Sequence, residues 1–263
     1  MLKPHLDPHD KTRAALDFDP LTTNYRKLLV EDWIDAASSF LDSSGNQGAP
    51  PIVFFLGSEL DRSLASHPKG WIALLALARA RVAERGLADR FQFTHDLLWT
   101  FGGRTNLDAS AATYLAMLDS ISLSQYTELD RFGATPEAGS KALKENEDEL
   151  RHFLKNAGIT DVQKIVINVG EFGIGSGGLK NPWYYSTDSR RNEDATVVGV
   201  KSFLHFFEAV PSSNRRLDWA ILWTVNEQYD IFANHQWRGD LRTERSPAAD
   251  LIEAYNRLHE RDM

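Results

Sequence analysis

Residues 52–60 read Ile-Val-Phe-Phe-Leu-Gly-Ser-Glu-Leu, an apolar run of strand length that ends in Gly57 and then in a single glutamate, Glu59. Residues 164–173 read Lys-Ile-Val-Ile-Asn-Val-Gly-Glu-Phe-Gly and end in the same way, with one glutamate, Glu171, after the glycine. An apolar run without polar alternation is typical of a parallel strand that is covered on both faces. The two runs therefore predict parallel strands of an α/β fold, each with a carboxylate at its C-terminal end.

The C-terminal ends of strands are where an α/β barrel carries its catalytic groups. Two carboxylates on different strands are also the pair that glycoside hydrolysis requires, because one protonates the leaving oxygen while the other attacks the sugar or activates water. A single glutamate after a strand can simply begin a surface loop, but two matching strand ends favour a function. The sequence therefore suggests Glu59 and Glu171 as a catalytic pair.

The composition is that of an ordinary globular protein, with 263 residues, 42% of them hydrophobic and 25% charged. The formal net charge is −8 without any basic block, so neither nucleic acid nor an anionic membrane surface is indicated as a partner. No apolar run is long enough to span a bilayer. The absence of cysteine excludes disulfides, thiolate metal ligands and thiol nucleophiles. The N-terminus lacks the basic-then-apolar pattern of a signal peptide, which leaves the compartment unknown.

Six strand-then-helix units follow one another, without an internal repeat or a linker long enough to separate two domains. Strands are expected at residues 1–6, 52–57, 91–94, 120–123, 164–169 and 219–225, and helices at 24–41, 71–85, 109–116, 136–156, 195–210 and 247–259. Strict alternation predicts a parallel sheet with right-handed crossovers, in one domain that covers residues 1–263. A closed barrel of this type needs eight units, two more than the six expected here.

With these strands placed, the chain resembles the clan A glycoside hydrolases, and most closely family 113, the β-mannanase-like group. Five short motifs occur in the family's order: residues 1–7 (third strand), 57–60 (fourth), 119–126 (sixth), 170–173 (seventh) and 221–223 (eighth). The resemblance implies a (β/α)8 TIM-type barrel that lacks its first two βα units. Ser58 departs from the pattern, since many clan members carry asparagine before the acid/base, and this weakens the expected contact to the sugar 2-hydroxyl.

The resemblance implies retaining hydrolysis of a β-linked glycan, with β-mannan as the leading substrate and with neither a cofactor nor a catalytic metal. Glu59 is expected to be the acid/base and Glu171 the nucleophile. Tyr126 is expected to donate a hydrogen bond that keeps Glu171 ionised, although a buried core tyrosine is an equal interpretation. Further substrate contacts are expected from Lys3, His5, His95, Trp99, Trp183 and Trp223. Each of these has a structural alternative, such as a core aromatic residue or a strand-end histidine.

Two other site types have weaker support in the sequence. Residues 173–178 read Gly-Ile-Gly-Ser-Gly-Gly and match the dinucleotide fingerprint, but Pro182 follows and no second strand comes soon enough. Metal-ligating residue types occur at His5, Asp7, His9, Asp10, His95 and Asp96. The later strands offer no matching histidine for a metal-dependent hydrolase.

The competing interpretation from another class is a non-catalytic carbohydrate-binding protein or an inactive remnant. Without its first two units, the sheet would expose two edges, through which the chain could self-associate. The presence of both glutamates argues against long decay. Coding sequence upstream of Met1 would distinguish a fragment of an ordinary enzyme from a partial barrel.

Overall fold

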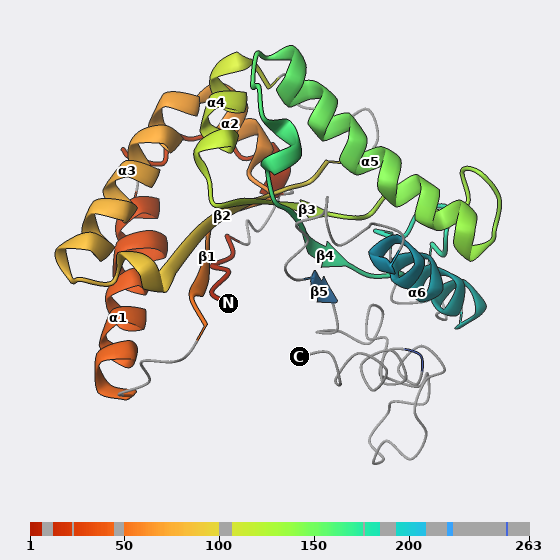
Figure 1. The fold of residues 1–263 in the computed structure, drawn as a ribbon, viewed down its shortest axis with the longest axis horizontal. Helices are drawn as coiled ribbons and strands as arrows, with labels where there is room; N and C mark the ends of the chain where they lie inside the picture. Colours follow the sequence, from red (N-terminus) through yellow and green to blue (C-terminus); the bar gives the residue numbers. More distant parts are fainter. Residues whose placement is uncertain are drawn as a thin grey trace. The chain divides into compact units, whose positions relative to one another are not determined.

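A computed structural model describes residues 1–6, 13–22, 24–44, 50–99, 107–175, 177–184, 193–208, 220–222 and 251. Within these residues, five strands form one sheet in the order β1-β2-β3-β4-β5, and the pairs β1–β2, β2–β3 and β4–β5 are parallel (Figure 1). The strands are β1 (Ile52–Ser58), β2 (Phe91–Leu97), β3 (Ser120–Ser124), β4 (Ile167–Phe172) and β5 (Ala220–Leu222). The predicted α/β fold with a parallel sheet is thus confirmed.

The helices that alternate with these strands are α1 (Asp32–Ser44), α2 (Asp61–Ser66), α3 (Pro68–Glu84), α4 (Ala109–Met117), α5 (Pro136–Asn156) and α6 (Glu193–Glu208). Short 3-10 helices lie at η1 (Arg13–Ala15), η3 (Ala88–Arg90) and η4 (Val162–Lys164), and a π-helix, η2 (Arg26–Glu31), leads into α1. The sequence did not predict α2, because a helix of six residues is too short to show a helical period.

Three predicted strands differ from the structure. The strand expected over residues 91–94 extends to Leu97, so His95 and Asp96 lie inside β2 and not after it. The strand expected over residues 1–6 is reduced to one parallel bridge, in which Leu2 N–H donates to Val53 O at 2.8 Å and Phe55 N–H donates to Leu2 O at 2.9 Å. The strand expected over residues 164–169 is shifted along the chain to Ile167–Phe172, and η4 covers Val162–Lys164 before it. Because β4 continues to Phe172, Glu171 lies inside β4. The expected last helix falls outside the described residues, apart from the helical Leu251.

The chain forms two compact units. One comprises Met1–Leu123 and Arg151–Asn168, and the other comprises Ser124–Leu150 and Val169–Met263. The division passes through β3, α5 and β4, so each of these elements contributes residues to both units. The expectation of a single domain stays a prediction.

The first unit builds its core from β1, β2 and a row of helices. The helices α1, α3 and α4 follow one another in Figure 1, and α3 contacts both of the others. Every residue of β1 after Ile52 and every residue of β2 except Gln92 is buried, which is the pattern of strands covered on both faces. Phe54 and Phe93 pack edge to face between neighbouring strands, and Trp71 of α3 is fully buried.

The second unit builds its core from α5, α6 and β4. Phe172 of β4 stacks on Phe203 of α6 with ring centroids 4.9 Å apart, and Leu143 of α5 is buried in the same cluster. A Cβ on Gly139 of α5 would lie only 2.1 Å from Ser202 Oγ of α6, so this close approach of the helices requires glycine. This packing fixes β4, the strand that carries Glu171.

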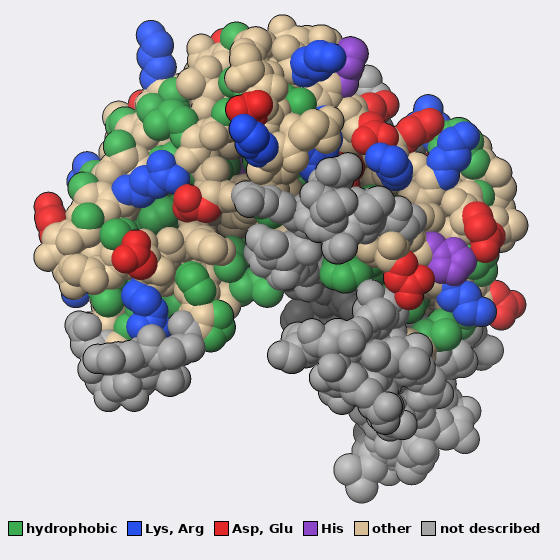
Figure 2. Space-filling view, viewed as in Figure 1, with side chains coloured by type: hydrophobic (Ala, Val, Ile, Leu, Met, Phe, Trp, Pro, Cys, Tyr) green, Lys and Arg blue, Asp and Glu red, His purple; other side chains and the backbone are tan. Residues whose placement is uncertain are grey.

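The surface carries charges of both signs. On the face drawn in Figure 2, acidic and basic side chains are interspersed, as expected for a solvated surface. Within the described part of the chain, no helix combines the length and the apolar character needed to cross a membrane.

Candidate active site

Glu59 occupies a strained position directly after β1. Among the described residues it is the only non-glycine residue with a positive φ, 55°. Its N–H donates to Asp96 O at 2.8 Å, which extends the ladder between β1 and β2 past the end of β1. Left-handed backbone at a residue with a side chain costs about 1–3 kcal/mol and persists where the surroundings hold it, often at functional sites. A register shift between Phe55 and Gly57 also changes the direction of the strand at this end.

Gly57 of the predicted motif is required by the ring of His95. His95 is fully buried, its Nδ1 lies 3.1 Å from the Tyr114 hydroxyl, and its ring packs edge to face on Trp71 at 4.8 Å. A Cβ on Gly57 would lie 2.4 Å from His95 Cε1. Burial lowers the pKa of His95 to about 3, so the ring is neutral. This placement gives His95 a packing role, and its expected contact with the substrate stays a prediction.

The substitution Gly57→Ala is expected to destabilise the fold by about 1–3 kcal/mol, the usual cost of overpacking a tight core. Urea unfolding measures this loss. Because the overlap is with the imidazole, the same substitution should cost much less in a His95→Ala background, and the double-mutant cycle reports this coupling. Equal costs in the two backgrounds would show that His95 does not explain the glycine.

Cationic side chains from the N-terminal segment meet the carboxylates of the first unit. Lys3 Nζ lies 2.7 Å from Asp96 Oδ2, and Arg13 Nη2 lies 3.1 Å from Glu59 Oε2. Arg13 also contacts His5 Nδ1. The carboxylate oxygens of Glu59 and Asp96 come within 4.8 Å of one another. Lys3 and His5, both predicted as substrate contacts, thus lie beside this cluster, whereas no sequence signal pointed to Arg13.

Carboxylates of this kind are also common ligands of divalent cations. Glu59 and Asp96, however, each pair already with a cationic side chain, Arg13 and Lys3 respectively. The cluster is therefore a set of compensated charges, and we assign no metal to it.

Asp61 is, after Glu59 and Asp96, a third buried acidic residue among the described residues of the first unit, and it was not identified from the sequence. It begins α2, is 2% exposed, and its Oδ2 accepts the N–H of Leu98 at 3.1 Å. Burial raises the pKa of Asp61 to about 7; the negative charges of Glu59 and Asp96 add to this rise, and the bond from Leu98 opposes it. In the sequence, an aspartate after a strand end looks like the aspartate of an ordinary surface turn. Only its burial in the structure distinguishes Asp61 from such a residue.

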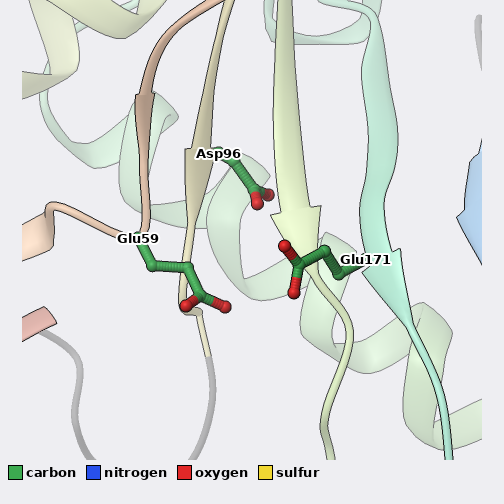
Figure 3. Close-up of side chains that lie close together, drawn as sticks. All are labelled: Glu59, Asp96 and Glu171. Carbon is green, nitrogen blue, oxygen red and sulfur yellow. The ribbon is translucent and has the colours of Figure 1, made fainter. Parts of the chain in front are cut away.

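Glu171 in the second unit has the partner that the sequence predicted. It is 2% exposed, and the hydroxyl of Tyr126 donates to its Oε2 at 3.1 Å. The backbone O of Glu171 accepts the N–H of Gln125 at 2.7 Å, and Gln125 Oε1 accepts Asn146 Nδ2 of α5 at 2.7 Å. These bonds hold the end of β3 and β4 in register. Figure 3 shows Glu171, Glu59 and Asp96, which come from the ends of β4, β1 and β2.

The predicted aromatic contacts lie in different environments. Trp99 is 5% exposed and packs on Phe153, with centroids 5.7 Å apart, as a core residue would. Trp183 is 50% exposed and meets Tyr184 edge to face at 6.0 Å, so it is available on the loop after β4. Trp223 lies outside the described residues.

The glycine-rich loop after β4 differs from a dinucleotide site. Such a site needs a helix that opens on the glycines. Residues 177–184 instead form a turn that an antiparallel bridge between Gly177 and Asn181 closes. Gly175 N–H donates to Pro182 O at 2.8 Å and Gly177 N–H donates to Tyr184 O at 3.0 Å, so the loop folds onto itself.

No protein-family model matches the sequence, and no curated protein matches it. A solved structure with a related fold is described as "Complex structure of GH113 beta-1,4-mannanase". The two chains superpose with a TM-score of 0.56 and 15% sequence identity, over 94% of this chain and 69% of the other. At this identity the likeness concerns the fold alone. The chain is therefore similar in fold to a family 113 β-1,4-mannanase, in agreement with the resemblance seen in the sequence.

Proposed function

We propose that this chain is a retaining glycoside hydrolase for β-linked glycans, with Glu59 as acid/base and Glu171 as nucleophile. The observation that carries the proposal is the burial of both glutamates at the carboxyl ends of strands in one parallel sheet. Parallel α/β enzymes carry their catalytic groups there. The likeness in fold to a β-1,4-mannanase supports the class and makes β-mannan the first substrate to test. We further propose that the sheet belongs to a (β/α)8 barrel.

The environment of Glu171 suits a nucleophile. A hydrogen bond that is donated to a carboxylate stabilises its ionised form, and the Tyr126 hydroxyl makes such a bond in a buried setting. An ionised carboxylate can attack the anomeric carbon and form the glycosyl–enzyme intermediate. The mechanism requires the two carboxyl groups to stand about 5–5.5 Å apart when the substrate is bound.

The environment of Glu59 must change during the reaction. The Arg13 guanidinium favours the ionised carboxylate, whereas a general acid has to be protonated when the glycan binds. We propose that the glycosidic oxygen displaces Arg13 as it approaches Glu59. Removal of the cation from a buried carboxyl then favours the neutral acid that donates the proton.

The stereochemistry of the first product tests this proposal. Proton NMR of a manno-oligosaccharide digest should show the β-anomer first and the α-anomer later, through mutarotation, because double displacement retains the configuration. An initial α-anomer would contradict the retaining mechanism and indicate a water between the carboxylates.

The substitution Tyr126→Phe is expected to lower kcat by about 10–100-fold, in line with the ~1.5–3 kcal/mol attributed to a hydrogen bond to a charged group. Steady-state kinetics on manno-oligosaccharides measure the effect. The matched control is Tyr114→Phe, which removes the hydroxyl of another buried tyrosine, bonded to His95. Equal kcat values for the two variants would remove Tyr126 from the proposed site.

A further inference from the structure

We propose that Asp61 is a positioning residue for Glu59. Asp61 links the segments that follow β1 and β2, and its carboxyl is electrostatically coupled to that of Glu59, the proposed acid/base. The inference rests on the proposed function, because it names what holds and tunes the acid/base of that reaction. Asp61 is two residues from Glu59 in the chain, and its carboxylate reaches Leu98, the residue directly after β2.

Two hydrogen bonds link the exits of β1 and β2. Glu59 N–H donates to Asp96 O at 2.8 Å, and Leu98 N–H donates to Asp61 Oδ2 at 3.1 Å. The first bond runs between backbones, and the second depends on a side chain. Together these bonds and the chain segments 59–61 and 96–98 form a closed ring at the C-terminal ends of β1 and β2. This ring constrains the left-handed backbone of Glu59, and loss of the Asp61 carboxyl would leave it held from one side.

Asp61 is itself held in place by the anchoring of α2. Ser63 Oγ donates to Phe18 O at 2.7 Å, and Trp71 Nε1 donates to Ser63 Oγ at 3.1 Å. Leu64 is fully buried in the same helix. A helix of six residues with these attachments has little freedom to swing the Asp61 carboxyl away from Leu98.

Burial, and then the negative charges around Asp61, favour its neutral form, whereas the hydrogen bond from Leu98 N–H opposes it. The acidic groups that face it are Glu59, in the turn after β1, and Asp96 of β2. Those two carboxylates pair with cations, Glu59 with Arg13 of η1 and Asp96 with Lys3 of the N-terminal segment. Among the described residues, no cationic side chain pairs with Asp61 itself. Asp61 therefore titrates near neutrality, with a pKa of about 7, in a group of coupled carboxyls.

This titration affects stability in a definite direction. The folded state keeps the proton of Asp61 up to about pH 7, whereas an unfolded aspartate releases it near its model value of 3.8. The folded state then binds more protons between these two values, so the free energy of unfolding falls as the pH rises through this window. Asp61→Asn keeps an oxygen acceptor for Leu98 N–H but cannot titrate, so it should reduce this fall.

The test combines unfolding and kinetics on the full chain. Urea unfolding from pH 4 to 8 should show a shallower decline for Asp61→Asn than for the wild type. The matched control is Asp119→Asn, which alters another aspartate that accepts a backbone N–H of β2, from Phe93, at the opposite end of that strand. The control should keep the wild-type decline. An unchanged decline in Asp61→Asn would overturn the proton-sharing part of the proposal.

Kinetics on manno-oligosaccharides test the positioning part. Asp61→Ala should lower kcat by about 10–100-fold with little change in KM, since small misplacements of a catalytic group have effects of this size. Asp61→Asn should retain most of kcat and alter the shape of the kcat/KM–pH profile. A kcat and a kcat/KM–pH profile equal to those of the wild type in both variants would overturn the positioning role. If Asp61→Ala does not fold, the pH profile of Asp61→Asn decides alone. If the wild type turns over no glycan, the proposed function fails, while the unfolding experiment still decides whether Asp61 holds the proton.

Discussion

Replacement of Glu171 by glutamine is expected to lower glycan hydrolysis by about 10⁴–10⁶-fold, because an enzyme that loses its nucleophile loses the covalent route. Glutamine has the size of glutamate and can still accept the hydrogen bond from Tyr126, so the buried site should keep its packing. Circular dichroism and urea unfolding should match the wild type. Glu84→Gln, on the exposed end of α3, is the control for the chemistry of the substitution.

Azide distinguishes the loss of a nucleophile from a general loss of structure. In Glu171→Ala, azide can occupy the space left by the carboxylate and attack the anomeric carbon directly. A single displacement inverts the configuration, so a β-linked activated glycoside should give an α-glycosyl azide. Activity of Glu171→Gln near that of the wild type, or a rescued product with β-configuration, would show that Glu171 is not the nucleophile.

Replacement of Glu59 by glutamine is expected to lower the hydrolysis of natural glycans by about 10²–10⁴-fold, the usual contribution of general acid catalysis. Activated aryl glycosides need little protonation of the leaving oxygen, so glycosylation should be much less affected with a dinitrophenyl substrate. The comparison of kcat/KM on the two substrates measures this difference. An equal loss on both would count against Glu59 as the acid.

The alanine variant at the same position extends this test to the second half of the reaction. In Glu59→Ala, azide can replace the water that the base no longer activates and attack the glycosyl–enzyme intermediate. Because this attack comes second, the product should be a β-glycosyl azide. Opposite anomers from Glu59→Ala and Glu171→Ala would assign the two roles, whereas α-azide from both would contradict the assignment.

The sheet could be predicted from the sequence because β1 begins with five apolar residues in a row and the strands β2 and β3 carry apolar residues at alternate positions. The runs that begin at Ile52 and Phe91 and the short run at Ser120 start where the strands start. The N-terminal strand could not be judged in the same way, since only Leu2 of that segment pairs with β1, through a contact with distant residues. The strand β4 begins three residues later than expected, and the apolar pattern does not reveal the 3-10 turn η4 that comes before it.

The contacts of the candidate site were predictable where they follow from strand ends and were missed where they depend on packing. The bond from Tyr126 to Glu171 follows from neighbouring strands that end together. Arg13 reaches Glu59 from a 3-10 turn 46 residues earlier in the chain, and no periodicity signals such a contact. The sequence also could not separate His95, fully buried against Gly57, from a strand-end histidine that faces a substrate.

Hydrolysis of a panel of β-linked polysaccharides by the purified chain tests the central claim most directly. The panel contains mannan, glucomannan, cellulose and xylan, with Glu171→Gln assayed in parallel. The proposed function predicts release of reducing ends from at least one of these glycans, mannan first, and none from the variant. A folded wild-type chain that leaves every glycan intact would contradict a hydrolase. If that chain also binds a glycan, the result would favour a non-catalytic carbohydrate-binding protein.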